Sequence, residues 1–172
     1  MNNRIPKDFF ITKGSGLSDI TMHAGAFHFA LWDAGIDGYN FVKYSSVLHK
    51  KAECVNIESI KSMPEHGSEM MCIQAIAEGK GGETISAGII YGYLYDLEGN
   101  CYGGIVCEES NTYGESQLTY KLINIIDDMY CKTYKTKGLI LRDVKTITEE
   151  LSIPNDVRFG CCLVSLCFIN YL

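Results

Sequence analysis

Two adjacent serines, Ser45 and Ser46, stand among residues whose types could carry out acyl chemistry. They close a run of aromatic and β-branched residues at 39–44 that predicts a strand. Asn40 lies in that run, and Glu108 follows 62 residues after Ser46. A serine hydroxyl can act as a nucleophile, a glutamate as a proton donor, and a carboxamide as a donor to an oxyanion. Each of these residues, taken alone, is more often part of a strand end or a turn, or a solvated charge. A functional interpretation therefore depends on their occurring together.

Three further segments lie downstream of the serine pair in the chain. They are Gly-Glu-Thr-Ile-Ser-Ala at 82–87, Gly-Ile-Val-Cys-Glu at 104–108 and Phe-Gly-Cys-Cys at 159–162. With Asn40 and the serine pair, this pattern covers most of the chain, from about residue 26 to about residue 168. On these motifs the sequence resembles the pyruvoyl-dependent arginine decarboxylases.

The resemblance implies that the chain cuts itself between Ser45 and Ser46, giving residues 1–45 and 46–172. The Ser46 hydroxyl attacks the preceding carbonyl, and Asn40 is the expected donor to the resulting oxyanion. Elimination from the ester, followed by hydrolysis, turns Ser46 into a pyruvoyl group, which is the expected cofactor. The resemblance implies neither a metal nor pyridoxal phosphate.

The implied reaction converts a small-molecule amino acid, arginine, to agmatine and carbon dioxide. Glu108 matches the family's catalytic glutamate, which donates a proton to the former α-carbon. Glu109 is the neighbouring alternative, but alternation along a strand would turn its side chain to the opposite face. Polyamine supply and acid resistance both remain open as the pathway.

The sequence departs from the family pattern where the substrate guanidinium is expected to bind. An acidic residue is expected in the first helix, and the spacing from the serines places His28 there. Asp33, one turn further along, and Asp19, before the helix, are alternative carboxylates. Two other functions therefore stay open: the same chemistry on a different amino acid, and an unprocessed, catalytically silent homologue that binds or regulates an active partner.

Composition narrows the class of protein. A chain of 172 residues fits a single domain, and its net charge of -6 without a Lys/Arg-rich run argues against a nucleic-acid partner. No apolar run is long enough to span a bilayer, and residues 1–8 lack the apolar core of a secretion signal, so we expect a cytoplasmic protein with no membrane partner. The eight cysteines contain no C-x-x-C pair, so we expect reduced, mostly buried thiols and no metal site.

Hydrophobic periodicity predicts many strands and two helices, and hence an α+β fold. The glycines of Gly14-Ser15-Gly16 are expected to break the first strand, and Gly35 to end the first helix. The expected strands are 9–12, 39–45, 55–60, 70–77, 85–95, 101–107, 139–148 and a central strand at 159–171; a helix is the alternative at 139–148. A hairpin turn is expected at 96–100, between the strands 85–95 and 101–107. The expected helices are 21–34 and 115–134. The resemblance further implies a four-layer αββα sandwich, assembled as a homotrimer or a dimer of trimers with sites between subunits.

Overall fold

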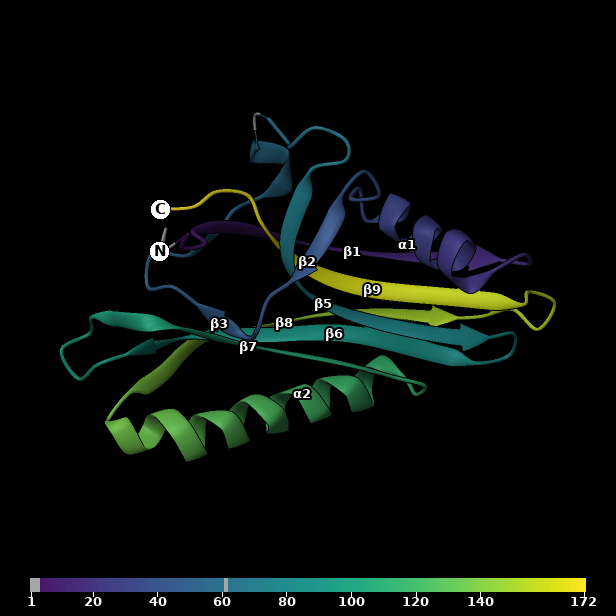
Figure 1. Ribbon diagram of the computed structural model, residues 1–172. Helices are drawn as coiled ribbons and strands as arrows, with labels where there is room; N and C mark the ends of the chain where they lie inside the picture. The colour runs from purple at the N-terminus through teal and green to yellow at the C-terminus, as the bar shows by residue number, and fades with distance from the viewer. Residues whose placement is uncertain (1–3, 61) are drawn as a thin grey trace.

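Two stacked β-sheets, each covered by a helix on its outer face, make up the protein (Figure 1). The computed structural model describes residues 4–60 and 62–172. The layers follow the order helix, sheet, sheet, helix, which confirms the expected α+β fold of the αββα type. No helix within these described residues is long and apolar enough to cross a membrane.

The first sheet has five strands in the order β2-β5-β9-β1-β4. Their bounds are Asn40–Lys43 for β2, Glu69–Lys80 for β5, Phe159–Phe168 for β9, Asp8–Ser18 for β1 and Glu53–Cys54 for β4. The last long strand, β9, pairs antiparallel with β5 on one side and with β1 on the other, so its predicted central position is confirmed.

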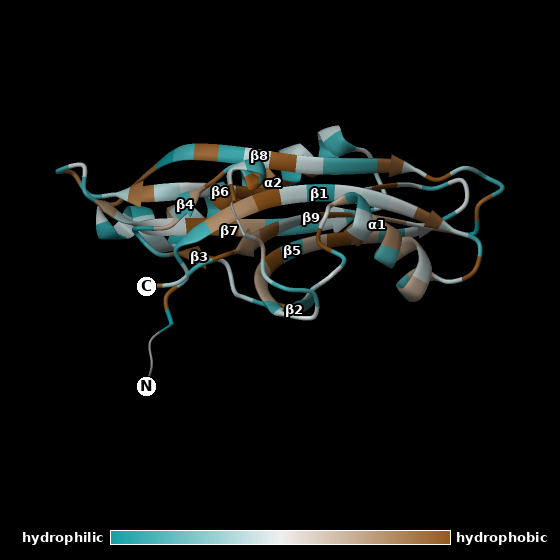
Figure 2. Ribbon diagram, turned by 90° about the horizontal axis from the view of Figure 1, so that it is seen from above, coloured by the Kyte–Doolittle hydropathy of each residue, from teal (hydrophilic) through white to brown (hydrophobic). Residues whose placement is uncertain are grey.

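The second sheet has four strands in the order β3-β7-β6-β8. Their bounds are Val47–Leu48 for β3, Cys101–Asn111 for β7, Thr84–Tyr95 for β6 and Ile140–Ser152 for β8. The hairpin predicted between β6 and β7 is present. At the sheet edge, β8 carries both hydrophobic and hydrophilic residues (Figure 2), and each of its residues is partly or fully exposed.

Each helix covers one sheet. A π-helical turn at Met22–Phe27 leads into α1 at His28–Asp33, which packs on the five-stranded sheet. The long helix α2, Glu115–Met129, packs on the four-stranded sheet and continues through shorter turns at Tyr130–Tyr134 and Lys135–Lys137. The hydrophobic core between the two sheets includes Phe9, Ile89 and Val164.

Two glycines predicted to break β1 instead allow a helix to approach it. Gly14 and Gly16 lie inside β1, which continues to Ser18. A Cβ atom at Gly14 would lie 2.6 Å from the backbone nitrogen of Ala34, and one at Gly16 would lie 2.5 Å from that of Ala30. The prediction of a break was therefore wrong, because these glycines serve close packing and not a turn.

The strand predicted at 55–60 is also wrong. A short 3₁₀ turn, Ile57–Ser59, occupies this region, and the side chain of Asn56 accepts a hydrogen bond of 3.0 Å from the Glu58 N–H. Such local side-chain bonds compete with sheet pairing. The pairing expected there is limited to β4, which lies parallel to the start of β1.

All eight cysteines are free. The five buried ones are Cys72, Cys107, Cys161, Cys162 and Cys167. Burial raises the pKa of the Cys72 and Cys107 thiols to about 11, so both are neutral near pH 7.

Candidate active site

The serine pair lies where the chain crosses from one sheet to the other. β2 belongs to the five-stranded sheet and ends at Lys43, whereas β3 begins at Val47 in the four-stranded sheet (Figure 1). Before the pair, the Tyr44 N–H donates to the Cys72 carbonyl oxygen at 2.8 Å. After it, the Ser46 carbonyl oxygen accepts from the Val106 N–H at 3.1 Å. The Ser45–Ser46 peptide bond is thus held between two separate sheets.

A tight turn centres on Ser46. The Val47 N–H donates to the Ser45 carbonyl oxygen at 2.9 Å, a bond that closes a three-residue γ-turn. Among the described non-glycine residues only Asp143 has a positive φ, so Ser46 has a negative one and the turn is the inverse type. The carbonyl that the Ser46 hydroxyl would attack therefore already accepts a hydrogen bond.

Glu108 contacts the Ser46 hydroxyl. Ser46 Oγ donates to Glu108 Oε2 at 3.3 Å, so the fold joins two predicted residues that are 62 positions apart. Ser46 is partly buried, and Glu108, which lies opposite Ile89 in the pairing of β7 with β6, is exposed. A hydroxyl, a polarised carbonyl and a carboxylate at one bend are the groups needed to make a pyruvoyl group from a serine.

The neighbouring carboxylate, Glu109, points elsewhere. Its Oε2 atom lies 2.8 Å from the Lys121 Nζ atom of α2, on the outer side of the four-stranded sheet. This orientation is the one that alternation along a strand predicts. Glu109 is therefore occupied by an ion pair on the face opposite to Ser46.

Asn40 supports a loop in this structure. Its Nδ2 atom donates to the Gly67 carbonyl oxygen at 2.7 Å, and its backbone N–H donates to the Ser68 carbonyl oxygen at 2.9 Å. Within residues 4–60 and 62–172, no hydrogen bond joins the Asn40 amide to Ser45 or Ser46. Its role in processing stays a prediction.

The residues predicted to bind the substrate belong to the helical layer on the five-stranded sheet. His28 is exposed, and its ring centroid lies 6.0 Å from that of Phe29. Asp33 Oδ2 accepts from the Ser15 N–H at 2.9 Å, which ties the end of α1 to β1. Asp19 Oδ1 accepts from the Arg158 N–H at 3.0 Å. None of the hydrogen bonds or ion pairs found over the described ranges links these residues to Ser46, so their roles also stay predictions.

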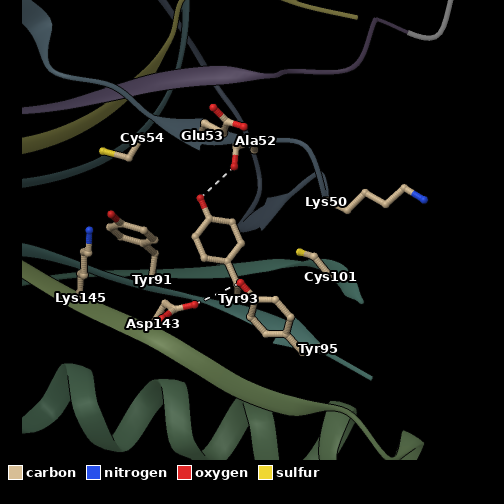
Figure 3. A pocket seen from close by; sticks show the side chains of 10 residues that line it. All are labelled: Lys50, Ala52, Glu53, Cys54, Tyr91, Tyr93, Tyr95, Cys101, Asp143 and Lys145. Atoms are coloured by element: carbon tan, nitrogen blue, oxygen red, sulfur yellow. Dashed lines mark hydrogen bonds between the residues drawn. The ribbon is translucent and has the colours of Figure 1, made fainter. Parts of the chain in front are cut away.

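A cavity of about 440 Å³ lies apart from the serine pair, between β4, the C-terminal part of β6 and the N-terminal part of β8 (Figure 3). Neither Ser46 nor Glu108 is among the residues that line it. Tyr93 donates to the Ala52 carbonyl oxygen at 2.9 Å, and Tyr95 donates to Asp143 Oδ2 at 3.1 Å. These tyrosines anchor the segment that follows β3 and the bulge of β8.

Comparison with known proteins decides the family. The model of the pyruvoyl-dependent arginine decarboxylase family matches residues 8–172. The chain belongs to this family. A pyruvoyl-dependent arginine decarboxylase of Methanococcoides burtonii is 30% identical over 115 residues, which cover 67% of this chain and 61% of that relative.

Other relatives match almost end to end. The pyruvoyl-dependent arginine decarboxylase AaxB of Chlamydia muridarum is 28% identical over 184 aligned positions, covering 98% of this chain and 93% of its own. A pyruvoyl-dependent arginine decarboxylase of Methanopyrus kandleri is 28% identical over 164 aligned positions, covering 95% of this chain and 97% of that relative. Family membership makes the Ser46–Glu108 contact a candidate site of processing and catalysis.

One group at this site could not be found from residue types. The Val47 N–H donates to the Ser45 carbonyl oxygen, but nearly every residue has a backbone N–H, so this group leaves no signal in the sequence. Only the turn at Ser46 distinguishes it. Residue types instead predict the Asn40 side chain as the donor to an oxyanion at this carbonyl.

Proposed function

We propose that this protein is a carboxy-lyase that cuts itself between Ser45 and Ser46 and then converts arginine to agmatine and carbon dioxide. The observation that carries the proposal is the contact between the Ser46 hydroxyl and the Glu108 carboxylate, 3.3 Å apart, at the crossing between the sheets. Membership of the family supports the reaction class, and the printed names of the relatives support arginine as the substrate.

Processing follows from the groups around Ser46. The hydroxyl proton passes to the Glu108 carboxylate as Ser46 Oγ bonds to the Ser45 carbonyl carbon. The carbon–nitrogen bond then breaks, and its electron pair and a proton go to the Ser46 nitrogen, leaving an ester. Loss of the α-proton of Ser46 expels the Ser45 carboxylate, and addition of water with release of ammonia leaves a ketone at the new chain end.

The pyruvoyl group supplies an electron sink for the carbanion that loss of carbon dioxide creates. Glu108 lies beside the position of that group and can hold the proton that the former α-carbon needs. The same carboxylate would therefore first take a proton, from Ser46, and later donate one to the product. Across the described ranges no group of three or more His, Cys, Asp or Glu side chains is placed to hold a metal ion.

Substrate binding is proposed to involve the α1 layer of another copy of the chain. Glu108 is exposed in the isolated chain, which supports a site completed by a neighbouring subunit. Large apolar side chains are also exposed on α1, with Trp32 68% and Phe29 47% accessible, and these could be covered in a homotrimer or a dimer of trimers. In such an assembly His28 or Asp33 of one copy could face Ser46 of another.

The cytoplasm is the proposed location. All eight cysteines are free, and reduced thiols are typical of proteins in reducing compartments.

The covalent state of position 46 tests the proposal. Denaturing mass spectrometry of the purified protein should show residues 1–45 and 46–172 as separate chains, with the second lacking a free amine. Carbon dioxide release should then be measured across a panel of amino acids, in which arginine is expected to be the best substrate. An intact chain would support the silent homologue, and a cleaved chain that prefers another amino acid would refute arginine alone.

A further inference from the structure

We infer that the backbone N–H of Val47 is the hydrogen-bond donor that stabilises the oxyanion formed when Ser46 attacks the Ser45 carbonyl. This inference rests on the proposed self-cleavage and adds a catalytic group to it. The observation that carries it is the 2.9 Å bond from the Val47 N–H to the Ser45 carbonyl oxygen. That oxygen is the one on which negative charge develops in the first step.

The donor is fixed before the reaction begins. The inverse γ-turn places the N–H across the turn from the reacting carbonyl, and no side chain has to move to make the bond. Preorganised donors aimed at a developing charge are effective because they cost no reorganisation at the moment of reaction. The turn thus supplies from the backbone the hydrogen-bond donor that an amide side chain would otherwise provide.

The N–H is free for this task because the sheet does not use it. Val47 lies opposite Ile105, and the neighbouring Ser46 carbonyl oxygen accepts from the Val106 N–H. In an antiparallel ladder this bond makes Val47 and Ile105 a non-hydrogen-bonded pair, so the Val47 N–H points away from β7. It points toward Ser45 and bonds there.

A separate contact holds the attacking hydroxyl. The Ser46 hydroxyl donates to Glu108, which receives its proton as the Oγ–carbon bond forms. The electron pair of the carbonyl double bond moves onto the oxygen held by the Val47 N–H. When the carbon–nitrogen bond breaks, this pair returns and the Ser46 nitrogen takes up the proton. In this step Glu108 therefore acts on the attacking hydroxyl, and the Val47 amide acts on the carbonyl that is attacked.

Replacing this single N–H by an oxygen tests the inference. The α-hydroxy acid analogue of valine, built into the full chain at position 47, gives an ester that lacks the donor and keeps the side chain. The same analogue at Val55 is a matched control, because the Val55 N–H donates to the Phe9 carbonyl oxygen at 2.8 Å, away from the serine pair. The readout is the rate of cutting between Ser45 and Ser46 by denaturing mass spectrometry, in which hydrolysis of the introduced ester gives a different mass.

A second pair of variants removes the donor by ordinary mutagenesis. Val47→Pro lacks the N–H, and Val47→Ala keeps it while trimming a side chain that is 59% exposed. We expect the position-47 ester and Val47→Pro to cleave roughly 10²-fold more slowly, the usual cost of losing one oxyanion donor. The position-55 ester should cleave at the wild-type rate, and Val47→Ala, which keeps the N–H, should cleave much faster than Val47→Pro. Circular dichroism verifies that each variant is folded.

The outcomes separate this inference from the function on which it rests. If the wild-type protein cleaves and the position-47 ester, folded, cleaves as fast as the position-55 ester, the Val47 N–H has no such role and self-cleavage stands. If the wild-type chain stays intact, the proposed function fails and the inference fails with it.

Discussion

Ser46 carries an ordinary hydroxyl, and its reactivity depends on the groups around it. A free serine hydroxyl is a weak nucleophile unless a base takes its proton or its target is polarised. The structure places Glu108 at the hydroxyl and the Val47 N–H at the Ser45 carbonyl oxygen, where the two proposed roles require them. The side chains of Ser46 and Glu108 can each be tested by substitution.

Ser46→Ala should abolish both the cut and the decarboxylase activity, because alanine has no oxygen to attack the carbonyl or to become the ketone. Ser45→Ala is the matched control, since it keeps the reacting carbonyl and the Ser46 hydroxyl and should still be cut. Denaturing mass spectrometry gives the fraction cleaved, and carbon dioxide release gives the activity. A cut chain in Ser46→Ala would contradict the assigned nucleophile.

Glu108→Gln should slow both cleavage and turnover. The glutamine side-chain oxygen can still accept the Ser46 hydroxyl and orient it, but the amide can neither take the hydroxyl proton nor deliver a proton to carbon. Loss of a general acid or base typically lowers a rate by about 10² to 10⁴-fold. The rate of cutting and the kcat of the cleaved fraction are measured separately. Glu109→Gln serves as the control, because Glu109 pairs with Lys121 on the other face. Cutting of Glu108→Gln at the wild-type rate would contradict the role of Glu108 as the base.

Among the secondary-structure elements, contact between β1 and the α1 layer leaves no room for a side chain at two positions. Gly16→Ala should destabilise the fold, because its Cβ would lie 2.5 Å from the backbone nitrogen of Ala30 and the helix cannot yield as a flexible side chain would. Overpacking of this kind costs about 1–3 kcal/mol. Ser15→Ala, between the two glycines, keeps the backbone bond to Asp33 and should change stability little. Urea denaturation compares the two variants, and an unchanged midpoint in Gly16→Ala would contradict the packing argument.

Two buried cysteines on inner strands of the sheets should lower the free energy of unfolding at alkaline pH. Burial raises the pKa of the Cys72 and Cys107 thiols from 9.0 to about 11, because the charged form is poorly solvated in the core. Below pH 9 the thiol is neutral in both folded and unfolded chains, so its contribution is fully present. Above pH 9 the unfolded chain loses the proton first, and stability falls as the pH rises from about 9 to 11.

The free energy of unfolding should therefore be lower at pH 10 than at pH 8. Cys107→Ala, which has no thiol to ionise, should lose less stability between these two pH values than the wild-type protein. An equal loss in both proteins would show that other groups cause the alkaline destabilisation.

At the scale of the whole molecule, the proposed cut separates the chain but not the fold. Residues 1–45 contain β1, which pairs with β9 through ten residues from Phe9 to Ser18, and β2, which pairs with β5. Phe9 and Phe10 of this segment are completely buried. The smaller product therefore supplies α1 and two strands of the five-stranded sheet.

The two products should stay together under native conditions and separate only in denaturant. Size-exclusion chromatography followed by denaturing mass spectrometry of each fraction would test this, with the uncut Ser46→Ala protein as the reference for elution volume. Release of residues 1–45 from the native protein would contradict the expectation, because it would expose the buried apolar surface of β9.

The sequence by itself determined the family, the central position of β9, the β6–β7 hairpin and the helix α2. These features depend on motif order and on local periodicity, which are written in consecutive residues. Periodicity failed at Gly14 and Gly16, where a glycine serves a neighbouring helix that the local sequence does not reveal.

Only the tertiary structure decided how the site is built. The Ser46–Glu108 contact joins residues 62 positions apart, and it depends on β3 pairing with β7. The turn that aims the Val47 N–H at the Ser45 carbonyl exists because the chain must pass from one sheet to the other within three residues, 44–46, anchored at both ends. Residue types name the groups that can react, whereas their distances follow from long-range packing, which no local pattern records.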